Sequence, residues 1–314
     1  MTDAVVVQDV SKRFGATSAL SGVSCAIRSG ELFGFIGPDG AGKTTLFRIL
    51  ATLLAPDSGH AHVLGEDVVT RLWSLRTRIG YMPGRFSLYP DLSVEENLRF
   101  FASVFGTTIA AERERISAIY GQLEPFKERR AGALSGGMKQ KLALCCALVH
   151  RPEILFLDEP TTGVDAVSRR EFWNLLGNLK AGGLTAVVST PYMDEANRCD
   201  RIALIQRGRL LAIDTPDAVA RSFNRPLIAV RSDKRYETLK ALREYPHTNT
   251  AYPFGESIHF TDKRTEVPRD AQQQQVRAFL AARGISHLTV EPAPPTVEDT
   301  FMARMGSDNA EDVA

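Results

Sequence analysis

Cysteine is scarce in this chain of 314 residues. Its four cysteines form no Cys-x-x-Cys pair and no Cys/His cluster with zinc spacing, which argues against a disulfide framework and against a metal knuckle. They are Cys25, Cys145, Cys146 and Cys199. A reduced, cytosolic setting fits this usage best.

Long apolar runs are also missing. The longest spans residues 142–149, far below the roughly 18 residues expected of a membrane-spanning helix. The N-terminal stretch MTDAVVVQDVSKRF lacks the basic head, apolar stretch and cleavage site of a secretory signal. We therefore expect a cytoplasmic protein, and if it serves transport, another chain must supply the pore.

Neither sign of charge dominates. Lys and Arg number 38 against 37 Asp and Glu, which gives a formal net charge of +1. This balance is not that of a basic nucleic-acid surface, so we expect no nucleic-acid partner. Hydrophobic residues make up 44% of the chain, enough for a normal core, and the length favours one large domain plus a small one.

Up to about residue 223, short apolar or β-branched runs alternate with longer helical stretches. Such alternation is typical of an α/β sheet. We expect strands at residues 4–7, 32–36, 154–157, 185–188 and 201–205.

A long insert at about residues 92–150 is expected to form a helical subdomain. Ser93 and Glu96 have the spacing of a capping box ahead of an apolar stripe. Ser168 and Glu171 have the same spacing, and we expect them to open a helix that Gly182 stops.

After residue 223 the pattern predicts a small α+β domain over residues 224–306. Short apolar runs at 227–230, 258–260 and 287–290 are separated by helical patterns at 236–243 and 272–283. The glutamine run that opens the second helical pattern could instead be a disordered polar tract. We expect residues 307–314 to be a disordered tail.

Residues 37–44 fit the pattern G-x-x-x-x-G-K-T between an expected strand and an expected helix. Backbone N–H groups of such a loop converge on phosphate oxygens, and the helix N-terminus adds a favourable dipole. Lys43 would reach the β and γ phosphates of ATP, and Thr44 would offer its hydroxyl to Mg²⁺. A tight turn with an exposed lysine is the alternative. The residues predicted to bind nucleotide here are Gly37, Pro38, Asp39, Gly40, Ala41, Gly42, Lys43, Thr44 and Thr45.

Two acids, Asp158 and Glu159, end the apolar run at residues 154–157. A buried strand that delivers carboxylates at its carboxyl end is where α/β sheets place ligand chemistry. Asp158 suits the Mg²⁺ shell, and Glu159 suits a catalytic role in polarising the attacking water. Two solvated acids after a strand are the alternative.

Between these elements lies the string LSGGMKQ at residues 134–140. Ser135 and the two glycines would start a helix, so that a hydroxyl and free N–H groups are offered to an anion. An ordinary serine-capped helix is the alternative.

This string resembles the LSGGQ-type signature of ABC ATPases, and the other landmarks of that family follow in order over about residues 4–220. The resemblance implies a P-loop NTPase fold of ABC type with a helical signature subdomain. It also implies a head-to-tail dimer in which the signature of one subunit closes over the nucleotide of the other. The residues implied in that contact are Ser135, Gly136, Gly137 and Gln140.

Two further residues resemble family landmarks. Phe14 resembles the aromatic that stacks on adenine, although a core aromatic is the alternative. Asp165 resembles the D-loop acid that crosses the dimer interface, although a turn or helix cap is the alternative.

At two positions the chain departs from the family pattern. Gly84 stands where the family has the Q-loop glutamine, and Pro191 stands where it has the switch histidine. Proline offers neither a side-chain donor nor a backbone N–H. We therefore expect ATP binding to survive better than hydrolysis, which would be slow or carried mainly by a second subunit.

The resemblance implies the ATP-binding subunit of a bacterial ABC transporter, and residues 295–301 resemble the closing motif of drug- or export-type members. Its expected cofactors are ATP and Mg²⁺. Its expected partners are an integral membrane permease, received at residues 85–91, and a second ATPase subunit in a homodimer or heterodimer. It would be peripheral on the inner face of the cell membrane. A non-transport ABC ATPase and a non-hydrolysing regulatory subunit are the alternatives.

Overall fold

The computed structural model describes the backbone of residues 2–311 and the side chains of residues 2–305. The chain divides into two compact units, Met1–Pro216 and Asp217–Ala314. The boundary lies seven residues before the one expected after residue 223. The reason is that α7 (Pro216–Arg221) bonds within the second unit, where the Val219 carbonyl accepts from the Thr300 hydroxyl at 3.0 Å.

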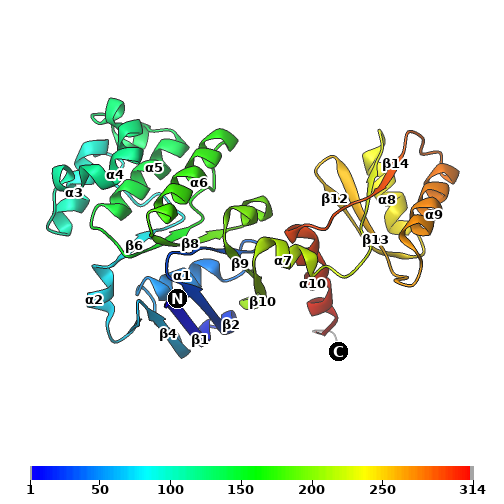
Figure 1. Cartoon of the computed structure of the whole chain (residues 1–314), viewed down its shortest axis with the longest axis horizontal. Coiled ribbons are helices and arrows are strands. Elements are labelled where there is room, and N and C mark those ends of the chain that lie inside the picture. Colours follow the sequence, from blue (N-terminus) through cyan, green and yellow to red (C-terminus); the bar gives the residue numbers. More distant parts are fainter. Residues whose placement is uncertain (1, 312–314) are drawn as a thin grey trace. The chain divides into compact units, whose positions relative to one another are not determined.

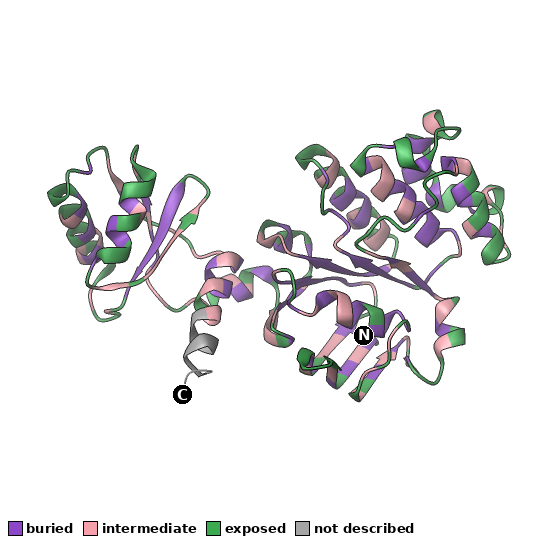
Figure 2. Cartoon of the chain, turned by 180° about the vertical axis from the view of Figure 1, so that it is seen from behind, coloured by how far each residue is buried: buried purple, intermediate pink, exposed green. Residues whose placement is uncertain are grey.

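The first unit is built on a six-stranded sheet in the order β10-β9-β3-β8-β7-β6 (Figure 1). Every neighbouring pair is parallel except β9 and β10. The strands β3, β7 and β8 are buried along their whole length (Figure 2). The bounds are β3 Leu32–Ile36, β6 Ile79–Met82, β7 Ile154–Asp158, β8 Thr185–Thr190, β9 Arg201–Gln206 and β10 Arg209–Asp214.

A second, antiparallel sheet has the order β2-β1-β4-β5. The helix α1 (Lys43–Leu50) contacts both sheets, and its Phe47 meets Phe35 of β3 and Phe156 of β7 edge to face, with centroids 5.9 and 6.1 Å apart. One apolar core therefore holds α1 between the sheets. The strands are β1 Asp3–Phe14, β2 Thr17–Arg28, β4 Ser58–Val63 and β5 Glu66–Asp67.

Helices cover the other face of the six-stranded sheet (Figure 1). α5 contacts β6, and α6 contacts β3 and β8. The expected insert forms mostly helix. Apart from α1, the helical elements of the first unit are α2 Leu72–Arg76, α3 Val94–Val104, α4 Ile109–Leu123, η1 Glu124–Phe126, η2 Ala131–Ala133, α5 Gly136–Leu148, α6 Ala166–Ala181 and η3 Met193–Arg198.

The two expected capping boxes had different outcomes. At α3 the box is confirmed, because Ser93 Oγ accepts from the Glu96 N–H and the Glu96 carboxylate accepts from the Ser93 N–H. At α6 the prediction was wrong. The helix begins two residues before Ser168, and Asp165 caps it by accepting from the N–H groups of Val167 and Ser168, both at 3.0 Å.

The second unit has the chain order β-α-β-β-α-β and the antiparallel sheet order β12-β13-β11-β14, as in ferredoxin-like folds. Apolar residues of both helices share a core with Ile228, Val230, Ile258 and Phe260 on one face of this sheet. The bounds are β11 Ile228–Arg231, α8 Arg235–Glu244, β12 Thr248–Phe254, β13 Ser257–Asp262, α9 Arg269–Ala282 and β14 Thr289–Pro292.

The glutamine run of the second unit is helical, as predicted. Gln272 is fully buried in the first turn of α9, and its amide donates to the carbonyls of Arg264 (2.9 Å) and Val267 (3.0 Å). The expected disordered tail overlaps the last helix, because α10 spans Val297–Glu311. Residues 307–311 are thus helical, and residues 312–314 lie outside the described part of the chain.

Candidate functional site

Four segments singled out in the sequence meet at one edge of the six-stranded sheet. The P-loop follows β3, the pair Asp158 and Glu159 ends β7, Gly84 comes after β6 and Pro191 comes after β8. These four strands are parallel, so their carboxyl ends lie at the same edge (Figure 1). The topology therefore gathers residues that lie up to about 150 positions apart in sequence.

The backbone of the P-loop leaves no space for side chains at its first and last glycine. A Cβ atom on Gly37 would lie 2.1 Å from the carbonyl oxygen of Ile205. Gly42 has φ 103°, and a Cβ atom there would lie 2.4 Å from the carbonyl oxygen of Ala19. Both positions require glycine, and the result is a loop wall made of backbone atoms.

Lys43 points into this loop instead of into solvent. Its side chain is 2% exposed, and its ammonium donates to the carbonyl oxygens of Gly37 (2.7 Å) and Pro38 (3.0 Å). It also lies 3.1 Å from Glu159 Oε1. The alternative, a tight turn with an exposed lysine, is therefore wrong. A buried cation surrounded by backbone is a site for an anion of phosphate type.

Ser189, at the penultimate position of β8, holds both acids. Its hydroxyl donates to Asp158 Oδ1 at 2.6 Å and accepts from the Glu159 N–H at 2.9 Å. Asp158 is 2% exposed and Glu159 is 20% exposed, so these are not two freely solvated carboxylates. Ser189 was not among the predicted site residues, because only the folded sheet brings it next to β7.

The two positions that depart from the family pattern lie beside this acid pair and the P-loop. A Cβ atom on Gly84 would lie 3.1 Å from the Asp158 carbonyl oxygen and 3.7 Å from Glu159 Cβ. Pro191 directly follows Thr190, whose carbonyl accepts from the Gly37 N–H at 3.2 Å. A side chain at position 84 would therefore start next to the acid pair, and Pro191 lies next to the strand end that bonds to the P-loop.

Phe14 is a surface aromatic. It ends β1, is 51% exposed and has the Lys12 ammonium 5.9 Å from its ring centroid. The alternative that it belongs to the core is wrong.

The signature residues form the start of α5 and lie against the start of α6. Ser135 Oγ accepts from the Met138 N–H at 3.4 Å, and a Cβ atom on Gly137 would lie 2.6 Å from Ser168. Asp165 caps α6, and hydrogen bonds from Ser168 and Val167 hold the pKa of its carboxyl below the ordinary value. Within the described residues, no hydrogen bond or ion pair joins Ser135 to the P-loop.

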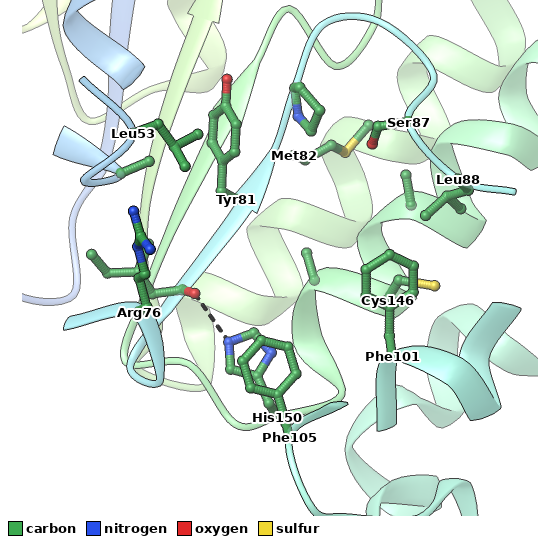
Figure 3. A pocket seen from close by; sticks show the side chains of 15 residues that line it. Leu53, Arg76, Tyr81, Met82, Ser87, Leu88, Phe101, Phe105, Cys146 and His150 are labelled. Atoms are coloured by element: carbon green, nitrogen blue, oxygen red, sulfur yellow. Dashed lines mark hydrogen bonds between the residues drawn. The ribbon is translucent and has the colours of Figure 1, made fainter. Parts of the chain in front are cut away.

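A separate apolar groove of about 430 Å³ lies beside β6, α3 and α5 (Figure 3). His150 forms part of its wall. The ring stacks on Phe105 with centroids 3.8 Å apart, its Nε2 donates to the Ile79 carbonyl at 3.0 Å, and burial lowers its pKa. The groove is thus lined mainly by apolar side chains, with His150, Arg76 and Ser87 as polar members of its wall. Other lining residues are Leu53, Tyr81, Met82, Leu88, Phe101 and Cys146.

Comparison with known proteins shows the family of the chain. The profile of the ABC transporter family matches residues 20–162. The Nod factor export ATP-binding protein I of Rhizobium sp. (strain N33) is 35% identical over 96% of this chain and 97% of its own length.

The chain belongs to the ABC transporter family. This assignment confirms the predicted family of ATP-binding proteins. The probable multidrug ABC transporter ATP-binding protein YbhF of Escherichia coli (strain K12) is 46% identical over 68% of this chain. The match covers 37% of the length of that protein.

Solved ABC cassettes confirm the predicted fold of the first unit. The cbiO1 protein of Clostridium perfringens, part of the ABC transporter complex cbiONQ, has 27% identity and a TM-score of 0.63 over 70% of this chain and 91% of its own. The ATP-binding cassette MJ0796, solved as a dimer in a post-hydrolysis state with ADP and Pi, has 27% identity and a TM-score of 0.60. That match covers 67% of this chain and 98% of MJ0796.

Proposed function

We propose that this chain binds MgATP and hydrolyses it to drive export by a separate integral membrane permease. The observation that carries the proposal is the buried Lys43 ammonium, which lies 3.1 Å from Glu159 inside a loop walled by backbone. The loop N–H groups and Lys43 would hold the phosphates. Phe14 would stack on the adenine.

Mg²⁺ fits the polar groups at this edge of the sheet. Thr44 offers a hydroxyl in the first turn of α1, and Asp158 offers a buried carboxylate that Ser189 orients. No cluster of three His, Cys, Asp or Glu ligands exists among the described residues. Mg²⁺ does not require one, because it keeps waters and binds through one or two protein ligands plus substrate phosphates.

Glu159 would act as the catalytic base that polarises the attacking water. Its carboxylate already lies beside Lys43, where the γ phosphate of a bound ATP would be. Gly84 and Pro191 lack the side chains by which the family contacts the water and the γ phosphate. Removing one preorganised group typically lowers turnover about 10²- to 10³-fold, so we expect tight binding and slow intrinsic hydrolysis.

We propose a second ATPase subunit as a partner. Ser135, Gly136, Gly137 and Gln140 would complete the site of the opposite subunit, and Asp165 would lie at the same interface. The dimeric MJ0796 cassette supports this arrangement. The substitutions Gly84 and Pro191 favour a heterodimer in which the second subunit carries most of the turnover.

The apolar groove supports a membrane partner. Exposed aromatics continue it over the surface, with Tyr89 against Phe100 at 4.9 Å and Phe100 against Phe101 at 5.4 Å between centroids. Exposed apolar patches of this kind mark protein interfaces. Within residues 2–311 no helix has the length and apolar composition needed to cross a membrane. We therefore propose a peripheral location on the inner face of the cell membrane, with the groove receiving a helix of the permease.

A non-hydrolysing regulatory subunit is the second candidate, and Gly84 and Pro191 are the observations that favour it. The two candidates predict different effects of the substitution Glu159→Gln. In a hydrolysing subunit, Glu159→Gln removes turnover and leaves MgATP bound, whereas in a regulator it changes neither.

The test measures MgATP affinity and single-turnover hydrolysis of the purified chain. We expect Lys43→Ala to weaken MgATP binding by at least about tenfold, and Glu159→Gln to retain binding and lose about 10² or more in hydrolysis. Glu153→Gln is the matched control, because Glu153 is 53% exposed in a surface ion pair with Arg78. Equal binding by wild type and Lys43→Ala would refute the proposed function.

A further inference from the structure

A buried carboxylate that the mechanism above does not use joins two of the strand ends at the ATP site. Glu195, in η3, is 3% exposed. Its Oε2 accepts from the Thr190 hydroxyl at 2.5 Å, and its Oε1 accepts from the Thr161 hydroxyl at 2.8 Å. Thr190 ends β8, and Thr161 follows the end of β7. One side chain thus bridges segments about 30 residues apart.

Both bonded threonines are directly connected to the predicted nucleotide site. The Thr190 carbonyl accepts from the Gly37 N–H at 3.2 Å, which ties β8 to the first residue of the P-loop. Thr161 lies two residues after Glu159, in the turn closed by a hydrogen bond from the Thr162 N–H to the Glu159 carbonyl at 3.2 Å. Glu195 therefore links the P-loop side of the site to the acid side.

The same carboxylate fixes the turn that contains Pro191. The Thr190 hydroxyl accepts from the Tyr192 N–H at 3.0 Å while it donates to Glu195, and the Glu195 N–H donates to the Tyr192 carbonyl at 3.3 Å. Pro191 has a fixed φ and no N–H to contribute. The conformation of this turn rests on Thr190 and Glu195.

Arg169 of α6 balances the buried charge. Its Nε lies 3.7 Å from Glu195 Oε1, and its guanidinium lies 4.2 Å from the centroid of the Tyr192 ring. A buried carboxylate is retained in a fold only when it is paired and hydrogen-bonded. Here each oxygen accepts a hydrogen bond, and Arg169, which also pairs with Asp194, lies at ion-pair distance. Because Asp165 caps α6, the bridge also reaches the segment expected at the dimer interface.

We propose that Glu195 is a positioning residue for ATP hydrolysis by this chain. Its carboxylate holds the ends of β7 and β8 at a fixed spacing, so that Glu159 keeps its place relative to the P-loop although Pro191 supplies no donor of its own. The proposal rests on the proposed function. It adds a residue that acts through Thr161 and Thr190 and does not touch the nucleotide.

The charge is essential to this arrangement because both bonded partners are hydroxyl donors. A glutamine at position 195 has one acceptor oxygen, and its NH2 group carries two donor hydrogens. The nitrogen therefore cannot accept from the second hydroxyl in its present orientation. One hydroxyl would have to turn, and the spacing of the two strand ends would loosen. Small displacements of catalytic groups cost rate far more than affinity.

The test compares Glu195→Gln with Glu112→Gln. Glu112 is a matched control because its side chain is also buried (5% exposed) and bonded to a threonine and an arginine, Thr107 and Arg151, but it lies in α4. For Glu195→Gln we expect single-turnover hydrolysis to fall about tenfold or more while the Kd for MgATP changes by less than about threefold. For Glu112→Gln both quantities should stay within about twofold of wild type.

A second measurement needs no nucleotide. Amide hydrogen exchange followed by mass spectrometry should show faster exchange at residues 159–164 and 189–196 together in Glu195→Gln, and at neither segment in Glu112→Gln. If Glu195→Gln does not fold, Thr161→Val removes one of the two bonds and should give a smaller loss of rate, which Thr161→Ser restores.

Full hydrolysis by Glu195→Gln or by Thr161→Val would overturn the proposal, as would a parallel loss of rate and affinity in Glu195→Gln. A wild-type chain that binds no MgATP would overturn the proposed function as well. In contrast, if wild type binds and hydrolyses MgATP and Glu195→Gln hydrolyses it at the same rate, only the role of Glu195 is overturned.

Discussion

The backbone of Glu159 has φ 48°, in the left-handed region that residues other than glycine seldom adopt. The left-handed region costs about 1 to 2 kcal/mol for such a residue. Here the N–H of Glu159 donates to both oxygens of Ser189, at 2.9 and 3.1 Å, which offsets that cost. The conformation brings the carboxylate to within 3.1 Å of Lys43. Strain at this residue is thus linked to the position that the proposed hydrolysis requires.

Restoring the two family side chains tests whether their loss limits hydrolysis. We expect Pro191→His with Gly84→Gln to raise single-turnover hydrolysis by about tenfold or more, because each change adds a donor beside the acid pair. The Kd for MgATP should change little. A side chain at Gly84 requires the chain to shift slightly, since its Cβ would lie 3.1 Å from the Asp158 carbonyl.

The single changes and a Glu159→Gln background serve as controls for this prediction. An increase that persists in the Glu159→Gln background would show that the added side chains do not act through the proposed base. No increase in the double variant would mean that hydrolysis is not limited at these positions.

Among the structural elements, the P-loop glycines differ in why they are needed. Gly42 combines φ 103° with a backbone oxygen 2.4 Å from the point where a Cβ atom would lie, whereas Gly40 has φ 78° and no atom within 4 Å of that point. We expect Gly42→Ala to abolish measurable MgATP binding. Gly40→Ala should cost only about 1 to 2 kcal/mol of stability and retain binding. Isothermal titration with MgATP separates the two, and equal affinities would contradict the geometry.

The start of α10 is anchored by a fully buried carboxylate, that of Asp299. It accepts from the Thr296 N–H (2.8 Å), from His259 Nδ1 (2.6 Å) and from the Tyr252 hydroxyl. Burial raises the pKa of Asp299, but these hydrogen bonds outweigh it and hold the pKa below the usual value. These three hydrogen bonds lie on the sheet face opposite the apolar core. The motif at residues 295–301 therefore has a structural role in the second unit.

Asp299→Asn should destabilise the second unit by about 2 to 3 kcal/mol, because it removes the charged acceptor from a buried network. Since the folded pKa lies below the unfolded value of about 3.9, the stabilisation is present above that pH and is lost as pH falls through the folded pKa. Calorimetric unfolding of wild type, Asp299→Asn and the exposed control Asp233→Asn checks this. Equal transitions for Asp299→Asn and wild type at pH 7 would disprove the anchor.

The sequence predicts some elements well and others poorly for physical reasons. The strands β3, β7 and β8 are buried on both faces, so they appear as continuous apolar runs. In contrast, β4 contains a glycine and two histidines, and β6 contains Gly80, so neither has a clear strand pattern. Pairing with neighbours determines these strands.

The same limit applies to the site. Motifs local in sequence, such as the P-loop and the acids after β7, can be predicted from spacing. Ser189 and Glu195 cannot, because their partners Asp158 and Thr161 lie more than 30 residues away and meet them only in the folded sheet. The Ser168 prediction was wrong for a related reason: Asp165, an equally good N-cap by residue type, caps the helix three residues earlier.

Of the two units, the first holds the proposed nucleotide site, the signature and the groove, and the second is a ferredoxin-like fold that follows it in the chain. The groove and the signature are both surfaces that we expect to need other chains to act. The relative 35% identical over 97% of its own length carries the name of an export ATP-binding protein. This agrees with the proposal that the chain works as one subunit of a larger assembly.

The most direct test is to extract the chain gently from its native membrane with detergent and measure MgATP hydrolysis by whatever remains bound to it. We predict that an integral membrane protein co-purifies and that the complex hydrolyses MgATP. A preparation without any membrane protein, or a complex that does not hydrolyse MgATP, would contradict the proposed role in transport.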